Sequence, residues 1–240
     1  MTGTAIDSAG EFWEVFRRPV IPIPRHQPSQ AKVLPTRVFI SEETKLRAIV
    51  ADIAARRQHG QPSLVGTRTI GNSEKLSALL EAAGIPHRLL NAVQDAEEAE
   101  TVAAAGDHGA VTIATNMAGR GTHISLSREI LALGGLHVIA LEMEESRRID
   151  LQLTGRGARQ GQPGSNQTFL SADDFILRRY LPDEAKKLAA GRADTHGEVT
   201  GGRWESLFFK AQALAEKTRY ETRQGLLRHD DWLSETKRRL

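Results

Sequence analysis

The sequence of 240 residues contains no cysteine, which excludes disulfides, thiolate zinc sites, iron–sulfur clusters and a cysteine nucleophile. It also lacks any apolar run near the roughly 20 residues that a membrane-spanning helix needs. The first residues have neither the basic segment nor the apolar segment of a signal peptide. These absences favour a cytoplasmic protein.

Excess charge of one sign and aromatic side chains are also scarce. The chain has 32 Lys and Arg against 30 Asp and Glu, a formal net charge of +2, and only 5% aromatic residues. Nucleic-acid binders usually present a basic surface, and single-strand binders add aromatic side chains on which bases stack. The composition therefore gives no support to a nucleic-acid or membrane-surface protein.

From about Val33 to Leu170 short apolar runs alternate with amphipathic stretches of helical length. Such alternation predicts an α/β fold in which helices cover both faces of a parallel sheet. The predicted strands are 38–40, 63–66, 87–90, 110–114, 136–140 and 168–170. The predicted helices between them are 42–59, 72–83, 96–105 and 148–154.

The two ends of the sequence differ from this central part. Residues 1–35 combine a short helical pattern near Phe12 with closely spaced prolines, which predict an extended connector without a core of its own. Residues 191–203 have little apolar content and predict a linker or a mobile loop. An apolar stripe along residues 204–228 then predicts a long helix that needs a partner surface.

The first of two candidate loops spans residues 114–123 and follows the clearest predicted strand. Gly119 and Gly121 flank Arg120, so the backbone can bend sharply and direct the guanidinium outward. In a parallel sheet, ligands bind beyond the carboxyl ends of the strands. This loop is expected at such an end.

The second loop, residues 152–161, holds Arg156 and Arg159 between glycines at the end of a predicted helix. Arginine binds phosphate through a charged fork that donates two hydrogen bonds, so arginines without matching carboxylates indicate an anion partner. Either loop alone is more often a surface turn with a solvated charge. Together, with both loops expected beyond the carboxyl ends of strands, they favour a phosphate site.

Other motifs of nucleotide chemistry are not in this sequence. It has no Gly-Lys pair, and therefore no phosphate-binding G-x-x-x-x-G-K-[ST] loop. The histidines lack metal-ligand spacing. Asp183 and Glu184 resemble an acidic magnesium motif, but they follow Pro182 and so predict the first turn of a helix. The chain looks like one side of a nucleotide site.

The two loops belong to longer strings with a family resemblance. Residues 111–122 and 152–161 are similar to motifs V and VI of SecA, the preprotein translocase motor ATPases whose two helicase-like domains hold ATP between them. The resemblance is collinear over nearly the whole chain. It includes Met1-Thr2-Gly3-Thr4-Ala5 (motif III), 64–67 with 73–74 (motif IV), 134–137 and 145–150 (the approach to motif VI), and 210–231 (the start of a helical scaffold).

The resemblance implies a domain organisation. Residues 36–190 would form the second motor domain, a RecA-like helicase C-terminal domain related to P-loop NTPases but without the P-loop. Residues 1–35 would be a connector from a first motor domain that is missing, residues 191–203 a linker, and residues 204–240 a long α-helix of the scaffold.

The resemblance also implies roles for single residues. Arg156 and Arg159 would be arginine fingers in ATP hydrolysis, and Arg120 would face the nucleotide from motif V. The remaining nucleotide-binding residues would be Gly119, Gly121, Gln152, Gly155 and Gly161.

By the same resemblance the cofactor is ATP, with Mg²⁺ held by the first motor domain, which lies in another chain or is missing from this fragment. No zinc or other metal is expected, and neither is ATP hydrolysis by this chain alone. The implied partners are a preprotein and the SecYEG channel, reached from the cytoplasm by peripheral contact with the inner membrane. Nucleic acid is not an expected partner.

Two alternatives remain open. One is a helicase-like half of a nucleic-acid remodelling ATPase. The other is a non-catalytic SecA-like remnant, which is favoured by His123 in the position of a family aspartate and by the missing first motor domain; Thr154, Gly157 and Ala158 also differ from the family's motif VI.

Overall fold

The computed structural model describes residues 4–90, 102–115, 123–200 and 202–239, with side chains described up to residue 229 in the last helix. All strand pairs in it are parallel, and the sheet has the order β1-β7-β6-β3-β5-β4, with β2 pairing to β7 as well. The strands are β1 Gln30–Val33, β2 Arg37–Phe39, β3 Ser63–Thr67, β4 Arg88–Leu90, β5 Val111–Thr115, β6 Leu136–Ala140 and β7 Pro163–Ser171.

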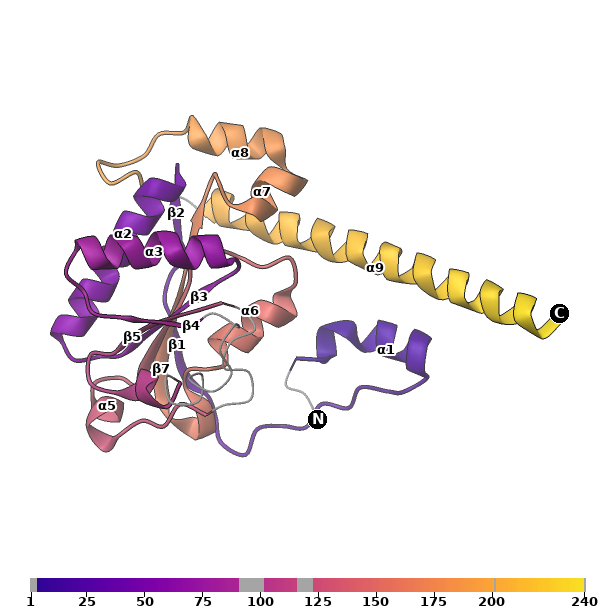
Figure 1. Ribbon diagram of the computed structural model, residues 1–240, viewed down its shortest axis with the longest axis horizontal. Helices are drawn as coiled ribbons and strands as arrows, with labels where there is room; N and C mark the ends of the chain where they lie inside the picture. The colour runs from indigo at the N-terminus through magenta and orange to yellow at the C-terminus, as the bar shows by residue number, and fades with distance from the viewer. Residues whose placement is uncertain (1–3, 91–101, 116–122, 201, 240) are drawn as a thin grey trace.

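Helices surround this sheet, and the last helix projects away from it (Figure 1). The α-helices are α1 Ala9–Phe16, α2 Glu42–Gln58, α3 Ile70–Ala82, α5 Arg128–Ala132, α6 Arg147–Thr154, α7 Phe175–Tyr180, α8 Pro182–Ala189 and α9 Gly202–Arg239. The short 3₁₀ turns are η1 Ile6–Ser8, η2 Ala104–Gly106 and η3 Arg159–Gly161.

Helix α2 begins and ends where its sequence predicts. The Ser41 hydroxyl accepts a hydrogen bond from the Thr44 backbone N–H at 3.3 Å, and the first turn carries two glutamates. Acidic residues at the start and arginines at the end complement the helix dipole. In the same way Pro182 starts α8 with Asp183 and Glu184 in its first turn, which confirms the helical interpretation of that acidic pair.

Alternate residues of the strands pack into two separate cores. Val65 and Ile139, paired in register on β3 and β6, face α2 and α3. Their neighbours Leu64 and Val138 point to the opposite face, where Leu153 of α6 packs against them. The predicted parallel sheet with helices on both faces is confirmed, and its strands β3, β5 and β6 are buried along their whole length, as strands covered on both faces require.

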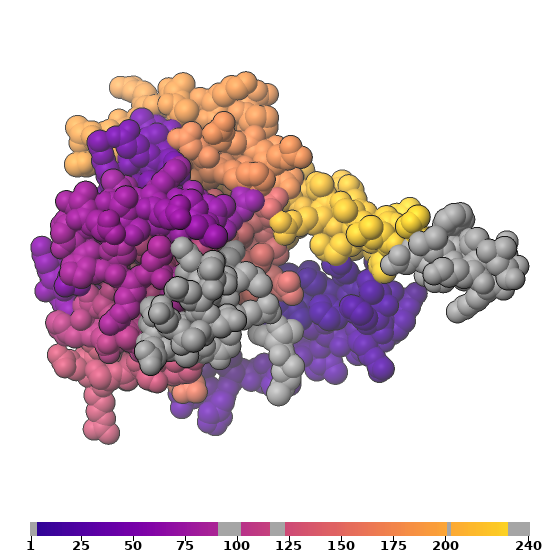
Figure 2. All heavy atoms as spheres, viewed as in Figure 1, coloured from indigo at the N-terminus to yellow at the C-terminus, as the bar shows by residue number. Residues whose placement is uncertain are grey.

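A third core joins α7, α8 and the start of α9. Phe208 and Ala211 of α9 are fully buried there, whereas Leu226 further along is 62% exposed. Helix α1 lies beside this projecting part of α9 (Figure 2). Arg223 of α9 donates to Glu11 of α1 at 2.5 Å and 2.8 Å. The long helix is confirmed, and its first turns find their partner surface in the domain itself.

Two segments are more ordered than their composition predicted. Residues 30–33, within the predicted connector, form the edge strand β1 with every residue exposed. Residues 191–200, predicted as a linker or mobile loop, pack beside β2, where Val199 N–H donates to Val38 O at 2.8 Å. Backbone hydrogen bonds hold both segments, and a hydrophobic pattern does not reveal such bonds. The predicted helix 96–105 falls largely outside the described residues; its end, 102–106, finishes in η2.

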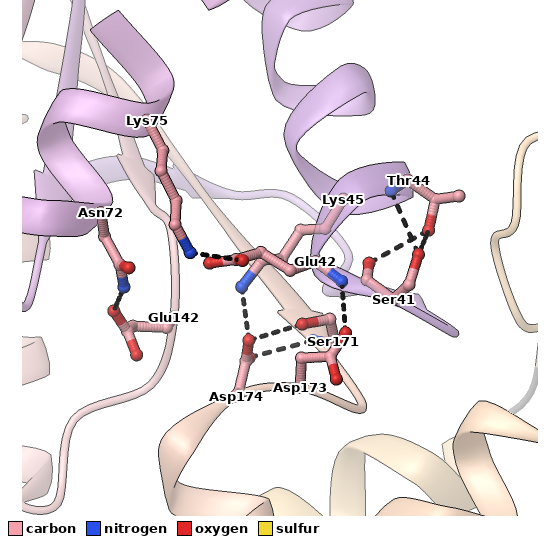
Figure 3. Close-up of polar contacts among 10 residues, drawn as sticks. All are labelled: Ser41, Glu42, Thr44, Lys45, Asn72, Lys75, Glu142, Ser171, Asp173 and Asp174. Atoms are coloured by element: carbon pink, nitrogen blue, oxygen red, sulfur yellow. Dashed lines mark hydrogen bonds and ion pairs between the residues drawn. The ribbon is translucent and has the colours of Figure 1, made fainter. Parts of the chain in front are cut away.

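A buried ion pair connects α2 to the turn between β7 and α7 (Figure 3). Lys45 and Asp174 are 1% and 4% exposed, and the ammonium donates to the carboxylate. Asp174 also accepts hydrogen bonds from Ser171, at 2.9 Å from the backbone N–H and 2.6 Å from the hydroxyl. Around it Lys75 donates to Glu42 at 2.7 Å and Asn72 donates to Glu142 at 2.6 Å. Paired side chains therefore fill this part of the carboxyl edge.

Removing one partner of the buried pair should destabilise the protein strongly. Asp174→Ala leaves the Lys45 ammonium buried without a counter-charge, so we expect the free energy of unfolding to fall by about 3–5 kcal/mol in urea denaturation. As a control, Glu221→Ala removes one side of an exposed pair with Lys217 and should change it by less than about 0.5 kcal/mol. Equal effects of the two changes would contradict the structural role of the pair.

Candidate functional site

Helix α6 carries the start of the candidate site and lies unusually close to the sheet. A Cβ atom on Gly66 of β3 would lie 2.3 Å from Cδ2 of Leu153, so the glycine permits this approach. The side chain of Gln152 points toward the N-terminal segment, where its amide lies 3.4 Å from the Thr4 hydroxyl. The segments that resemble motifs III and VI therefore touch.

The arginine loop, residues 155–161, lies between the end of α6 and the start of β7. A Cβ on Gly157 would lie 3.5 Å from the carbonyl oxygen of Leu136 at the beginning of β6, and a Cβ on Gly164 in β7 would lie 2.6 Å from the Ala158 nitrogen. The loop therefore sits at the edge where β6 and β7 begin. The prediction that both loops lie beyond the carboxyl ends of strands is wrong for this loop, because α6 carries the chain back along the sheet by about 12 Å.

The backbone of the arginine loop adopts unusual conformations around Arg159. Ala158 and Gln160 have φ angles of 50° and 55°, in the left-handed region that non-glycine residues rarely enter. Each such residue costs on the order of 1 kcal/mol or more and persists only where its surroundings hold it. The Arg159 Nε–H donates to the Gly155 carbonyl at 3.0 Å. That bond orients the guanidinium.

A groove of about 700 Å³ runs along this loop. Arg159, Gly155 and Gly161 line it together with the connector residues 25–27, and Gln27 lies directly against Gly161. Arg156 is half-buried at the end of α6 and is not among the residues that line the groove. The structure thus brings Gly155, Arg159 and Gly161 together, with Gln152 one turn earlier on α6.

The sequence interpretation missed that Arg25, His26 and Gln27 line this groove. The dense prolines indicated only that this segment is extended, and nothing in its sequence pattern indicated which part of the domain it would lie against.

Gly119, Arg120 and Gly121 of the first loop lie outside the described residues, and His123, which follows them in the sequence, is exposed.

The segment that connects β6 to α6 concentrates buried acids. Burial, with the charge of Asp150 as a smaller cause, raises the pKa of Glu144 to about 7. Burial also raises the pKa of Asp150 to about 6. Arg68 partly compensates, with its guanidinium 3.9 Å from Glu144 and 3.5 Å from Glu145. The start of α6 therefore holds protons near neutral pH.

Within the described residues no group of three or more acidic or histidine side chains is placed to hold a metal ion. Among the same residues, no helix has the combination of length and apolar character that crossing a bilayer requires.

Comparison with known proteins identifies relatives of this chain. The family model of the SecA P-loop domain matches residues 29–132 and 127–192. The chain is 43% identical over 233 residues to the protein translocase subunit SecA 2 of Magnetococcus marinus, covering 97% of this chain and 36% of that protein. It is 45% identical over 231 residues to the corresponding subunit of Rhodopirellula baltica, covering 96% and 35%. The chain thus spans about a third of the length of these relatives.

Among solved structures, the yeast DEAD-box splicing factor Prp28 has a similar fold. It superposes with a TM-score of 0.53 over 87% of this chain and 43% of its own chain, at 13% identity. At that identity the likeness concerns the fold alone. It confirms the predicted fold, a RecA-like parallel-sheet α/β domain, which in this chain is followed by a long helix.

The buried acids predict how stability depends on pH. The folded state keeps protons on Glu144 and Asp150 that the unfolded chain releases, so the free energy of unfolding rises as pH falls from 8 toward 5. Glu144→Gln mimics the protonated form and should raise the melting temperature at pH 8. The melting temperature of this variant should then rise less than that of the parent protein when the pH is lowered from 8 toward 5. Thermal unfolding at several pH values measures this. Glu221→Gln, a change at an exposed position, should show the same pH dependence of the melting temperature as the parent protein. If Glu144→Gln also shows that dependence, Glu144 does not hold a proton in the folded state near neutral pH.

The close approach at the arginine loop predicts a second effect. Gly164→Ala places a methyl group against the Ala158 backbone, so the loop must move and the free energy of unfolding should fall by about 1–3 kcal/mol. Urea denaturation measures the change. Gly71→Ala, where the added methyl group meets open space, should leave stability unchanged or slightly higher. A neutral Gly164→Ala would show that the loop is not held by this contact.

Proposed function

Because the chain belongs to the SecA family, we propose that it acts as the second motor domain of a SecA-like protein translocase. In this role residues 36–190 form the motor domain and residues 1–35 connect it to a first motor domain. Residues 204–240 begin the helical scaffold. The observation that carries the proposal is the arginine loop, which lines a groove with a charged, oriented guanidinium.

The described residues of the groove fit a phosphate group. Arg159 lines the groove beside Gly155 and Gly161, with the Gln27 side chain packed directly against Gly161, and Arg25 and His26 add cationic or ionisable groups to the lining. Arg156 and Arg159 would act as arginine fingers, which stabilise the charge that develops on a transferred phosphoryl group. Such fingers typically raise the rate about 10³–10⁵-fold, or roughly 4–7 kcal/mol of barrier.

Other residues would complete the contact with ATP. Gln152 would contact the nucleotide from α6, and Arg120 with Gly119 and Gly121 would face it from motif V. The sequence has no phosphate loop. We therefore propose that a first motor domain, in another chain or in another part of a longer protein, holds the triphosphate and its Mg²⁺.

The partners and the site of action that we propose are those implied by the family. Relatives of this chain are named protein translocase subunits, so we propose a preprotein and the SecYEG channel as partners. The site of action would be the cytoplasm and the inner membrane surface. The near-neutral charge and low aromatic content support this role over a nucleic-acid remodeller.

An ATPase measurement tests the proposal. We expect the chain alone to show no turnover, and its mixture with the first motor domain of the Magnetococcus marinus relative to hydrolyse ATP. Arg156→Ala or Arg159→Ala should lower that rate by about 10³-fold or more. Arg159→Lys should recover little, because lysine lacks the planar fork.

The matched control is Arg192→Ala, which removes an exposed arginine far along the chain from the loop. It should leave the rate of the mixture unchanged. If the chain alone hydrolyses ATP and Arg156→Ala abolishes that activity, the proposal that a first motor domain must complete the site is wrong. If Arg156→Ala and Arg159→Ala both keep full activity in the mixture, these residues are not arginine fingers.

A further inference from the structure

The long helix α9 binds the start of α6 through one buried amide. The side chain of Gln212 is 5% exposed and donates to two acceptors, the Glu144 carbonyl at 2.7 Å and Asp150 Oδ2 at 2.6 Å. The other oxygen of Asp150 accepts from the Glu144 backbone N–H at 3.0 Å. The three residues form a closed ring of hydrogen bonds, in which Gln212 alone comes from outside the segment 144–150.

Two further contacts continue along the same face of α9. Glu216 accepts from the Arg147 backbone N–H at 2.9 Å, at the first residue of α6. Arg219 donates to Glu145 at 2.6 Å. Gln212, Glu216 and Arg219 follow one another at spacings of four and three residues, so they share one helix face. We call these three residues and their contacts the α9 clamp.

The α9 clamp acts on the helix that leads to the arginine loop. Asp150 lies within α6, and the Thr154 hydroxyl in its last turn donates to the Asp150 carbonyl at 2.9 Å. Arg156 follows two residues later. A helix of eight residues moves as one short body of about 12 Å, so a displacement at Asp150 reaches the arginine loop.

The polar character of the α9 clamp makes it a reversible contact. Glu142, Glu145 and Asp150 stand around Glu144, with Arg68 and Arg219 paired to Glu145 as the facing cations. Breaking the clamp exposes groups that water solvates well, which costs less than separating an apolar interface of the same area. Beyond the clamp α9 continues to Arg239, so a movement of its far part reaches α6 through these residues.

We propose that Gln212 is a positioning residue for the arginine loop. By holding Asp150, it fixes α6 and with it the place of Arg156 and Arg159 relative to a bound nucleotide. The catalytic part of this inference depends on the proposed function, whereas the positioning part concerns this chain alone.

Hydrogen exchange of the chain tests the positioning part. Gln212→Leu keeps the size of the side chain and removes its donor, so we expect faster exchange of the amides over residues 147–161 and unchanged exchange in α2 and α3. The matched control is Gln224→Leu, the same change further along α9, where Gln224 bonds Glu14 of α1. It should leave residues 147–161 as in the parent. Parent-like exchange in Gln212→Leu would overturn the proposal.

A second variant separates positioning from a general loss of stability. Gln212→Glu sets a second carboxylate against the Asp150 carboxylate and the Glu144 backbone carbonyl at pH 8, and becomes a donor when protonated at pH 5.5. Exchange over residues 147–161, corrected for its intrinsic pH dependence, should be fast at pH 8 and parent-like at pH 5.5. Fast exchange at both pH values would overturn the role of the amide donor.

The catalytic part is measured in the mixture with a first motor domain. Gln212→Leu should lower kcat by about 10–100-fold, with little change in KM, because misplacement of a catalytic group by about 1 Å has an effect of that size. An unchanged kcat in Gln212→Leu, while Arg156→Ala abolishes turnover, would overturn the positioning role alone. An unchanged kcat in both variants would overturn the positioning role and the proposed function together.

Discussion

The contact between α6 and β3 is the constraint from which the arrangement of the candidate site follows. Gly66 lets Leu153 pack directly on the sheet, and this close packing sets the distance between α6 and the sheet. The arginine loop then begins at the edge where β6 and β7 start, beside the connector. A larger residue in place of Gly66 would lift the helix and, with it, the groove that Arg159 and the connector form together.

Sequence reasoning recovered what apolar periodicity and specific strings encode. Buried strands such as 111–115 and the capped start of α2 at Ser41 follow from local patterns, and the strings around Arg120 and Arg156 identified the family. It failed where tertiary hydrogen bonds decide. Strand β1 presents only exposed side chains, and the return of the chain along α6 depends on helix length and packing. No sequence signal indicates that residues 25–27 line the groove beside the arginine loop.

Polar groups are unusually important inside this domain, and they do two different things. The pair of Lys45 and Asp174 is enclosed by α2 and the β7–α7 turn, with each partner dependent on the other. The ring around Gln212 instead lies where one helix meets another, and its acids hold protons near neutral pH. Buried polar groups therefore fix the body of the domain in one place and join α9 to the start of α6 in the other.

Strand β7 is nine residues long and pairs on one side with two short strands in succession, β1 with its first part and β2 with its last. The chain that enters the domain is thereby bonded along the length of a central strand in parallel direction. A pull on the N-terminal segment along the strand axis loads those backbone bonds simultaneously, in shear, and does not peel them one by one. This geometry makes the N-terminal segment a mechanically strong attachment to the sheet.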